Sequence, residues 1–279
     1  MTRTPTIGVF DSGFGGLTVL RALVERLPGA RFCFLGDTAR LPYGSKSRRT
    51  IARYAAQSAR FLVGEQGAEF LVIACNTASA LALDAIQEAV TVPVLGVIEP
   101  GAEAARAASA SGDVLVIATD ATVQSHAYSA ACRARSLRAL EKACPLLVPL
   151  VEEGWTGHPV TAEVVRIYLG ELAAEAAALG MGADTLVLGC THYPLLRPLI
   201  EKAVPQGFRV IDSAESTAQA AARLLAGRMH APASGSESDA VRATQIRCFA
   251  TDSVEKFERL GSRFLGRSVG PVELIDLGG

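Results

Sequence analysis

Two cysteines, Cys75 and Cys190, each end an apolar run and directly precede small polar residues. If both runs are parallel strands, the thiols lie at the carboxyl edge of a sheet, where open α/β folds bind ligands. The residues that follow would begin a helix, whose unpaired N–H groups favour thiolate over thiol. Two thiols that face one ligand from opposite sides would act as a pair of bases. The two segments are residues 71–79 (LVIACNTAS) and 186–194 (LVLGCTHYP).

The six cysteines stand singly, without the Cys-x-x-Cys spacing of zinc sites or redox motifs. A cysteine at the end of an apolar strand is usually a small buried hydrophobic residue. That interpretation suffices for Cys33, Cys132, Cys144 and Cys248. It does not suffice for Cys75 and Cys190, because both precede Asn, Thr or His at a predicted helix start. His192 lies two residues after Cys190 and is a candidate partner for proton transfer.

Two glycine-containing loops follow the first two predicted strands. Residues 11–16 (DSGFGG) offer glycine N–H groups and the Ser12 hydroxyl to an anion. A tight turn with Asp11 as a helix N-cap is the alternative. The segment matches neither the dinucleotide fingerprint nor the P-loop. In residues 36–44, Tyr43 offers a hydroxyl at a strand end, although this loop alone is an ordinary turn.

Polar residues also follow predicted strands in the second half of the chain. Thr119 and Thr122 occupy the place there that Ser12 has in the first half. Glu152 and Glu153 follow a predicted strand that ends near residue 150. Adjacent glutamates on a loop are usually solvated, but at the mouth of a cleft one of them would tune a histidine or cysteine.

Short apolar segments alternate with alanine-rich segments of helical spacing along the whole chain. Pro100 and Gly101 are predicted to break the chain between its halves, and the polar residues 231–243 are predicted to form an exposed loop. The predicted strands are 7–10, 32–35, 70–75, 92–97, 114–118, 146–150, 185–189, 208–211, 245–250 and 272–275. The predicted helices are 17–27, 48–63, 76–90, 129–143, 161–179, 195–204, 214–228 and 253–265.

This alternation predicts an α/β fold with mostly parallel sheets and helices on both faces. We expect two similar three-layer α/β domains that face each other across a cleft, with one candidate cysteine on each. The first domain, with Cys75, would comprise residues 1–98 plus 211–279. The second, with Cys190, would comprise residues 99–210.

Composition narrows the classes of partner. The 279 residues carry a formal net charge of −1, and the basic residues are scattered, which argues against nucleic acid or an anionic membrane as partner. No apolar run approaches the length of a membrane span, and the N-terminus resembles no signal peptide. We therefore expect a cytoplasmic protein that acts on a small molecule. The oligomeric state is open, and a homodimer is one form we consider.

Taken together, these segments resemble the glutamate racemases of the aspartate/glutamate racemase superfamily. These cofactor-independent enzymes supply D-glutamate for bacterial peptidoglycan and so serve cell-wall biogenesis and cell shape. One departure is the pair Ala118-Thr119, where family members usually read Gly-Thr. The six matching segments are residues 8–16 (GVFDSGFGG), 37–44 (DTARLPYG), 74–78 (ACNTA), 97–101 (VIEPG), 148–152 (VPLVE) and 189–194 (GCTHYP).

The resemblance implies a role for each cysteine. Cys75 would take the α-proton from D-glutamate, and Cys190 would take it from L-glutamate. Asp11 would assist Cys75, while His192, with Glu152 behind it, would assist Cys190. No cofactor and no metal are implied, and none of the four lysines lies at a convincing Schiff-base position. The residues expected to bind the substrate are Asp11, Ser12, Pro42, Tyr43, Gly44, Asn76, Thr77, Thr119, Thr191 and His192.

Three alternatives stay open at this point. A racemase of the same superfamily that acts on aspartate or a hydantoin is the nearest. A cysteine hydrolase with Cys190 as nucleophile and His192 as base is the second, but it leaves Cys75 unexplained. The third is a non-enzymatic anion-binding module in which both cysteines are core residues.

Overall fold

Two parallel sheets form the framework of the computed structural model, which describes residues 5–227 and 244–278. Neighbouring strands pair in parallel throughout both sheets. The first sheet has the order β10 (Val272–Leu274), β9 (Gln245–Ala250), β2 (Arg31–Gly36), β1 (Thr6–Asp11), β3 (Phe70–Ile73) and β4 (Val94–Gly96). The second has the order β6 (Arg138–Ala143), β5 (Asp113–Ala118), β7 (Thr185–Gly189) and β8 (Arg209–Asp212). The predicted α/β class is confirmed.

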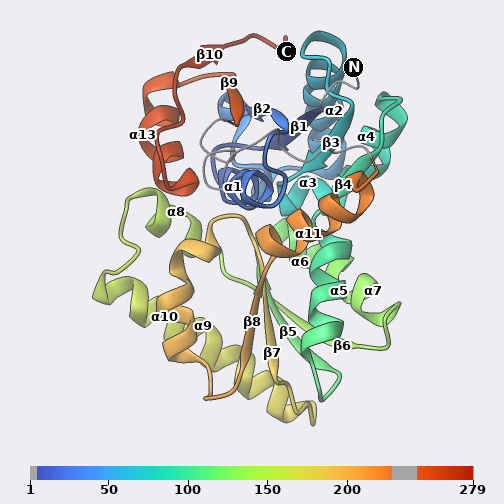
Figure 1. Cartoon of the computed structure of the whole chain (residues 1–279). Coiled ribbons are helices and arrows are strands. Elements are labelled where there is room, and N and C mark those ends of the chain that lie inside the picture. The colour runs from blue at the N-terminus through green and yellow to red at the C-terminus, as the bar shows by residue number, and fades with distance from the viewer. Residues whose placement is uncertain (1–4, 228–243, 279) are drawn as a thin grey trace.

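Helices cover both faces of each sheet (Figure 1). Strand residues are buried on both faces, as parallel sheets require: in β1, Val9 packs toward one helical layer and Phe10 toward the other. Around the first sheet lie α1 (Leu17–Arg26), α2 (Arg48–Arg60), α3 (Asn76–Leu81), α4 (Leu83–Ala89), α11 (Ser213–Leu225) and α13 (Val254–Leu265). Around the second lie α5 (Ile98–Ala108), α6 (Asp120–Gln124), α7 (Ala127–Arg133), α8 (Leu147–Glu152), α9 (Pro159–Ala178) and α10 (Arg197–Ala203).

The strands of each sheet come from distinct parts of the chain. Those of the first sheet lie within residues 6–96 and 245–274, and those of the second within residues 113–212. Strand β8 crosses the expected boundary at residues 210/211 and belongs to the second sheet. Helix α11 follows it and packs against both α1 and α5, so it contacts elements of both halves. The division into 1–98 plus 211–279 and 99–210 stays a prediction.

The predicted break at Pro100 and Gly101 is wrong, because both residues lie in the first turn of α5. The N–H groups of a first helical turn have no partner within the helix, so a proline there costs no hydrogen bond. Helix α5 instead continues to Ala108, and its buried face packs on the second sheet.

Two other predicted elements are also wrong. The predicted helix 129–143 consists of α7, which ends at Arg133, and the edge strand β6. Ser136 turns the chain between them with a φ of 57°. The predicted strand 146–150 is helix α8, whose Pro149 again lies in the first turn. A short apolar run has no period that distinguishes strand from helix. Glu152 therefore ends a helix and not a strand.

Smaller differences concern element ends. Strand β3 ends at Ile73, two residues before the predicted end at Cys75, and the predicted helix 76–90 is divided into α3 and α4 at Ala82. The predicted helix 48–63 continues beyond α2 as a π-helical turn, Phe61–Glu65. The predicted loop 231–243 and the end of the predicted helix 214–228 lie outside the described residues.

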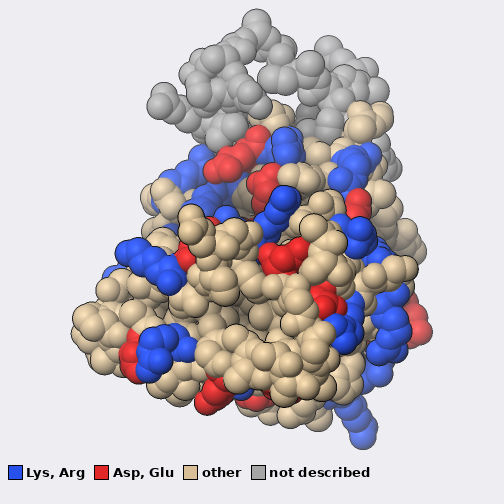
Figure 2. Space-filling view, turned by 90° about the horizontal axis from the view of Figure 1, so that it is seen from below, with Lys and Arg blue, Asp and Glu red and all other residues tan. Residues whose placement is uncertain are grey.

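Charged side chains are dispersed over the face of the molecule shown in Figure 2, where Lys and Arg lie among Asp and Glu and many uncharged residues. Within residues 5–227 and 244–278, none of the helices has the length and hydrophobicity that crossing a bilayer would require.

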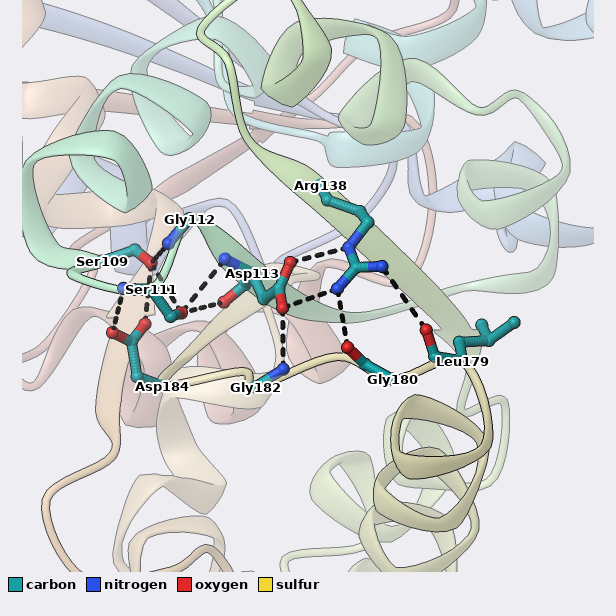
Figure 3. Close-up of polar contacts among 9 residues, drawn as sticks. All are labelled: Ser109, Ser111, Gly112, Asp113, Arg138, Leu179, Gly180, Gly182 and Asp184. Carbon is teal, nitrogen blue, oxygen red and sulfur yellow. Dashed lines mark hydrogen bonds and ion pairs between the residues drawn. The ribbon is translucent and has the colours of Figure 1, made fainter.

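A polar network closes the amino end of the second sheet, opposite the edge that carries Cys190 (Figure 3). Asp184 accepts hydrogen bonds from the Ser109 hydroxyl at 2.7 Å and from the Ser111 N–H at 2.8 Å. Asp113 accepts two from the Arg138 guanidinium, at 2.7 and 2.8 Å. Burial opposes ionisation of Asp184, but its hydrogen bonds outweigh that effect and hold its pKa well below the ordinary value.

Replacing Asp184 with alanine should lower the free energy of unfolding by about 2 kcal/mol, because the hydroxyls of the buried residues Ser109 and Thr185 lose a charged acceptor. The difference should begin to shrink as the pH falls below about 4, because the Asp184 carboxyl then takes up a proton in the unfolded chain, whereas its lowered pKa keeps it ionised in the folded chain. Urea denaturation at pH 7 and pH 3.5 measures both effects. The exposed Glu88 on α4 supplies the control variant Glu88→Ala; equal losses in the two variants would contradict a bracing role for Asp184.

Candidate active site

A cavity of about 220 Å³ lies where the carboxyl ends of the two sheets meet, and both candidate cysteines line it. Cys75 follows β3, and Cys190 follows β7. The lining residues therefore come from loops that are far apart in the sequence. The expected site residues that line the cavity are Ser12, Pro42, Tyr43, Gly44, Cys75, Asn76, Thr77, Thr119, Glu152, Cys190, Thr191 and His192.

Cys75 is buried at the start of α3, where its sulfur serves as the N-cap. The Sγ atom accepts the N–H of Ala78 at 3.4 Å, and the thiol donates to the Ser12 hydroxyl at 3.5 Å. Burial and the nearby charge of Asp11 raise the pKa of Cys75 to about 12 despite these bonds. The helix start favours thiolate, but at Cys75 this effect does not offset burial, and a pKa of about 12 leaves the side chain a thiol at neutral pH.

Cys190 begins a chain of polar groups that crosses the site. His192 Nδ1 lies 3.9 Å from Cys190 Sγ, and His192 Nε2 donates to Glu152 Oε1 at 3.3 Å. Glu152 Oε2 lies 3.6 Å from the ammonium group of Lys256, which extends from α13. This series of polar contacts thus connects the loop after β7 with the end of α8 and with α13.

These polar contacts keep the imidazole of His192 charged. Burial alone would lower the pKa of His192, but hydrogen bonds to Cys190 and Glu152 outweigh burial and raise it to about 10. Burial likewise opposes ionisation of Glu152, yet His192 and Lys256 lower its pKa below the ordinary value. At neutral pH, Cys190 therefore has a protonated imidazole beside it, whereas Cys75 has the acidic side chain of Asp11 nearby. The two thiols lie in unlike surroundings.

Asp11 lies behind the cavity wall and does not line it. Its Oδ2 atom accepts the N–H of Gly13 at 3.0 Å, and its Oδ1 atom has no hydrogen-bond partner among the described residues. Burial raises the pKa of Asp11, and the charge of His192 opposes this. Asp11 raises the pKa of Cys75 but does not line the cavity. Its expected assistance to Cys75 and its expected contact with the substrate therefore stay predictions.

The hydroxyl of Tyr43 does not point into the cavity, contrary to the prediction. It donates to Asp37 Oδ2 at 2.6 Å, and Asp37 also accepts the Thr251 hydroxyl at 2.9 Å. The buried ring of Tyr43 still forms part of the wall. Tyr43 thus shapes the cavity, and its polar group stabilises the first sheet's loops.

Three threonine hydroxyls from both halves of the chain meet at one side of the site. Thr77 Oγ1 lies 3.0 Å from Thr119 Oγ1 and 3.2 Å from Thr122 Oγ1, and the last two lie 2.9 Å apart. Thr119 thus presents its hydroxyl although Ala118 replaces the usual glycine before it. Hydroxyl donors in such a cluster suit a carboxylate. Thr122, which was predicted to lie with Thr119 at this strand end but was not among the expected substrate-binding residues, completes the cluster.

The loop after β1 packs tightly on the loop that carries Cys190. A Cβ atom at Gly15 would lie 2.3 Å from Thr191 Oγ1 and 2.6 Å from His192 Nδ1, so this close approach requires glycine. Nearby, the hydroxyl of Thr18 donates to the Thr191 carbonyl at 3.2 Å. The position of His192 therefore depends on a loop from the other half of the chain.

Other residues that line the cavity were not predicted from the sequence. Most of them adjoin expected ones, as Asp120 adjoins Thr119, while Pro145 and Val148 belong to the α8 region that was predicted as a strand. Lys256 has no local signal at all, because only the fold brings α13 to Glu152. The additional lining residues are Gly13, Phe14, Leu41, Ser45, Asp120, Pro145, Val148 and Pro149. Among the described residues, no group of three or more His, Cys, Asp or Glu side chains is arranged to hold a metal ion.

A model of the Asp/Glu/Hydantoin racemase family matches residues 7–221. The chain belongs to this family. It is 54% identical to a glutamate racemase of Koribacter versatilis, with 99% of each chain covered, and 45% identical to one of Geobacter metallireducens, with 97% and 96% covered. A crystal structure of glutamate racemase from Francisella tularensis in complex with D-glutamate superposes with a TM-score of 0.86 at 34% identity, covering 99% of each chain. The expected superfamily and the expected isomerase class are confirmed.

Replacing Glu152 with glutamine should lower the pKa of His192 from about 10 toward its ordinary value, because the imidazolium loses its charged partner. Titration of the imidazole nitrogens by NMR measures this. The matched control is Glu153→Gln, which removes an adjacent carboxylate that does not contact His192. An unchanged His192 titration in Glu152→Gln would contradict the polar chain described above.

Gly15→Ala should reduce racemase activity by roughly 100-fold, because the added methyl displaces Thr191 and His192 from their positions. Initial rates of racemisation test this. Gly170→Ala is the control, since a Cβ at this position in α9 meets no atom within 4 Å. Wild-type activity of Gly15→Ala would show that the two loops tolerate separation.

Proposed function

We propose that this protein interconverts L-glutamate and D-glutamate without a cofactor, with Cys75 and Cys190 as the two bases. The observation that carries the proposal is that both thiols line one cavity from opposite sheets. The full-length likeness to proteins named glutamate racemase supports the choice of substrate, as does a related structure that contains D-glutamate.

In the forward direction, the thiolate of Cys190 takes the α-proton of L-glutamate, and the negative charge spreads onto the α-carboxylate. The thiol of Cys75 then delivers its proton to the opposite face of the same carbon, which yields D-glutamate. Each turnover leaves Cys190 as thiol and Cys75 as thiolate, so the reverse reaction begins with Cys75. Proton transfer by two placed groups and stabilisation of the developing charge together lower the barrier.

The neighbouring groups fit this division. His192, held by Glu152, exchanges protons with Cys190, and Asp11 assists Cys75. The raised pKa of Cys75 suits a proton donor, and the substrate ammonium would favour its thiolate in the reverse direction. Hydroxyl, amide and N–H groups would hold the substrate's carboxylates and ammonium. We assign these polar contacts to Ser12, Gly44, Asn76, Thr77, Thr119, Thr191 and His192, whereas Pro42 and the ring of Tyr43 would shape the cavity and Asp11 would act from behind its wall.

In the cell, this activity would supply D-glutamate for peptidoglycan synthesis in the cytoplasm. A small-molecule substrate needs no nucleic acid or membrane partner. Pairing of two copies into a homodimer would be compatible with this role.

Cys75→Ala and Cys190→Ala should each reduce racemisation of both enantiomers by about 10³-fold or more, because each direction needs both a base and an acid. Circular dichroism of L-glutamate and of D-glutamate solutions follows the reaction. Cys248→Ala, which changes a buried cysteine of β9, is the matched control and should keep full activity.

Either single variant racemising glutamate at the wild-type rate would overturn the assignment. The same assay with aspartate distinguishes the substrates: faster turnover of aspartate would favour the related racemase. Trapping of an ester as a covalent adduct on Cys190, without racemisation, would favour a hydrolase.

A further inference from the structure

Tyr128 of α7 is fully buried and bonds directly to a side chain of the candidate site. Its hydroxyl donates to Asn76 Oδ1 at 2.7 Å. Asn76 follows Cys75, lines the cavity and is itself 3% exposed. The ring of Tyr128 belongs to the core cluster of the second sheet, whereas Asn76 begins a helix of the first. The bond therefore connects the two halves of the chain beside one of the two thiols.

The contact fixes which way the Asn76 amide faces. Its oxygen is occupied by the Tyr128 hydroxyl, and its nitrogen donates to the Ser213 hydroxyl at 3.4 Å from the start of α11. An amide nitrogen carries two hydrogens, and among the described residues it has this one partner, so one N–H of the cavity-lining Asn76 is available to a ligand. A carboxylate needs donors, and this orientation presents a donor to it. The reversed amide would present an oxygen and repel a carboxylate.

The same ring also contacts the segment that carries the other cysteine. A Cβ atom at Gly189 would lie 2.9 Å from Tyr128 Cε2, so the last residue of β7 packs directly on the ring. Gly189 immediately precedes Cys190. Tyr128 thus contacts the residue after Cys75 through its hydroxyl and the residue before Cys190 through its ring.

We propose that Tyr128 is a positioning residue for the reaction, which holds the Asn76 amide with an N–H toward a substrate carboxylate and seats the strand end before Cys190. The proposal rests on the proposed function, in which Asn76 binds the substrate. If Tyr128 had a purely structural role, loss of its hydroxyl would lower stability but would not affect kcat/KM through Asn76. The two roles therefore differ in whether the effect of Tyr128→Phe on kcat/KM depends on Asn76.

A double-mutant cycle tests the role. Tyr128→Phe should lower kcat/KM for glutamate about 10-fold, mainly through a higher KM, because Asn76 loses the bond that orients it. In the Asn76→Ala background, the same substitution should change kcat/KM less than 2-fold. A wild-type kcat/KM for Tyr128→Phe, or an equal loss in both backgrounds, would overturn the proposal.

Tyr193→Phe is the matched control. It also removes a fully buried hydroxyl, but within the described part of the chain that hydroxyl bonds to main-chain carbonyls alone, those of Ala118 and Cys144. Its effect on kcat/KM should be the same with and without Asn76. The unfolding temperature of each variant is measured to check that the variant is folded at the assay temperature.

Asn76→Asp gives a second test that does not depend on the folding of Tyr128→Phe. It keeps an acceptor for Tyr128 but replaces the N–H with an oxygen, and it should raise KM for glutamate at least 10-fold. An unchanged KM would contradict the proposed orientation. Absence of glutamate racemisation by the unmodified chain would overturn the proposed function itself, whereas an active chain with an unaffected Tyr128→Phe overturns only the positioning role.

Discussion

The carboxyl ends of two parallel sheets meet at one cavity, and the rest of the site depends on that arrangement. Side chains that follow parallel strands gather at one edge of a sheet, so β3 and β7 each deliver a thiol to the same space. Loops from one half of the chain also hold side chains of the other half in position. The loop at Gly15, for example, packs directly against His192. The network around Asp184 lies at the opposite end of the second sheet, away from the edge that carries Cys190.

Equivalent places in the two sheets do not give the thiols equivalent surroundings. Cys75 is buried beside a carboxylate and a serine hydroxyl, whereas Cys190 is next to an imidazolium held by Glu152. A symmetric pair would give both thiols the same protonation state, and a racemase needs one acid and one base in each direction. In the proposed reaction, these unlike partners would support the different roles of the two thiols.

Strands with strong apolar runs could be predicted from the sequence, as β7 was to the residue, because burial on both faces leaves a clear pattern. The structure of the short apolar run at residues 146–150 could not be predicted, because so short a run has no period that distinguishes strand from helix. It forms helix α8, whose first turn accommodates Pro149. Cavity-lining residues that directly follow strands, such as Ser12 and Thr119, could be predicted from the sequence. Tyr128 and Lys256 could not, because only tertiary contacts bring them to Asn76 and Glu152.

In the proposed reaction, two sulfur atoms serve opposite faces of one carbon. The most direct measurement is the initial reaction of L-glutamate in D₂O without added cofactor, followed by mass spectrometry of both enantiomers. The account predicts that the D-glutamate formed carries deuterium at the α-carbon, while the remaining L-glutamate still carries hydrogen. D-glutamate that retains the original hydrogen would show that one group both removes and returns the proton, and would contradict the account.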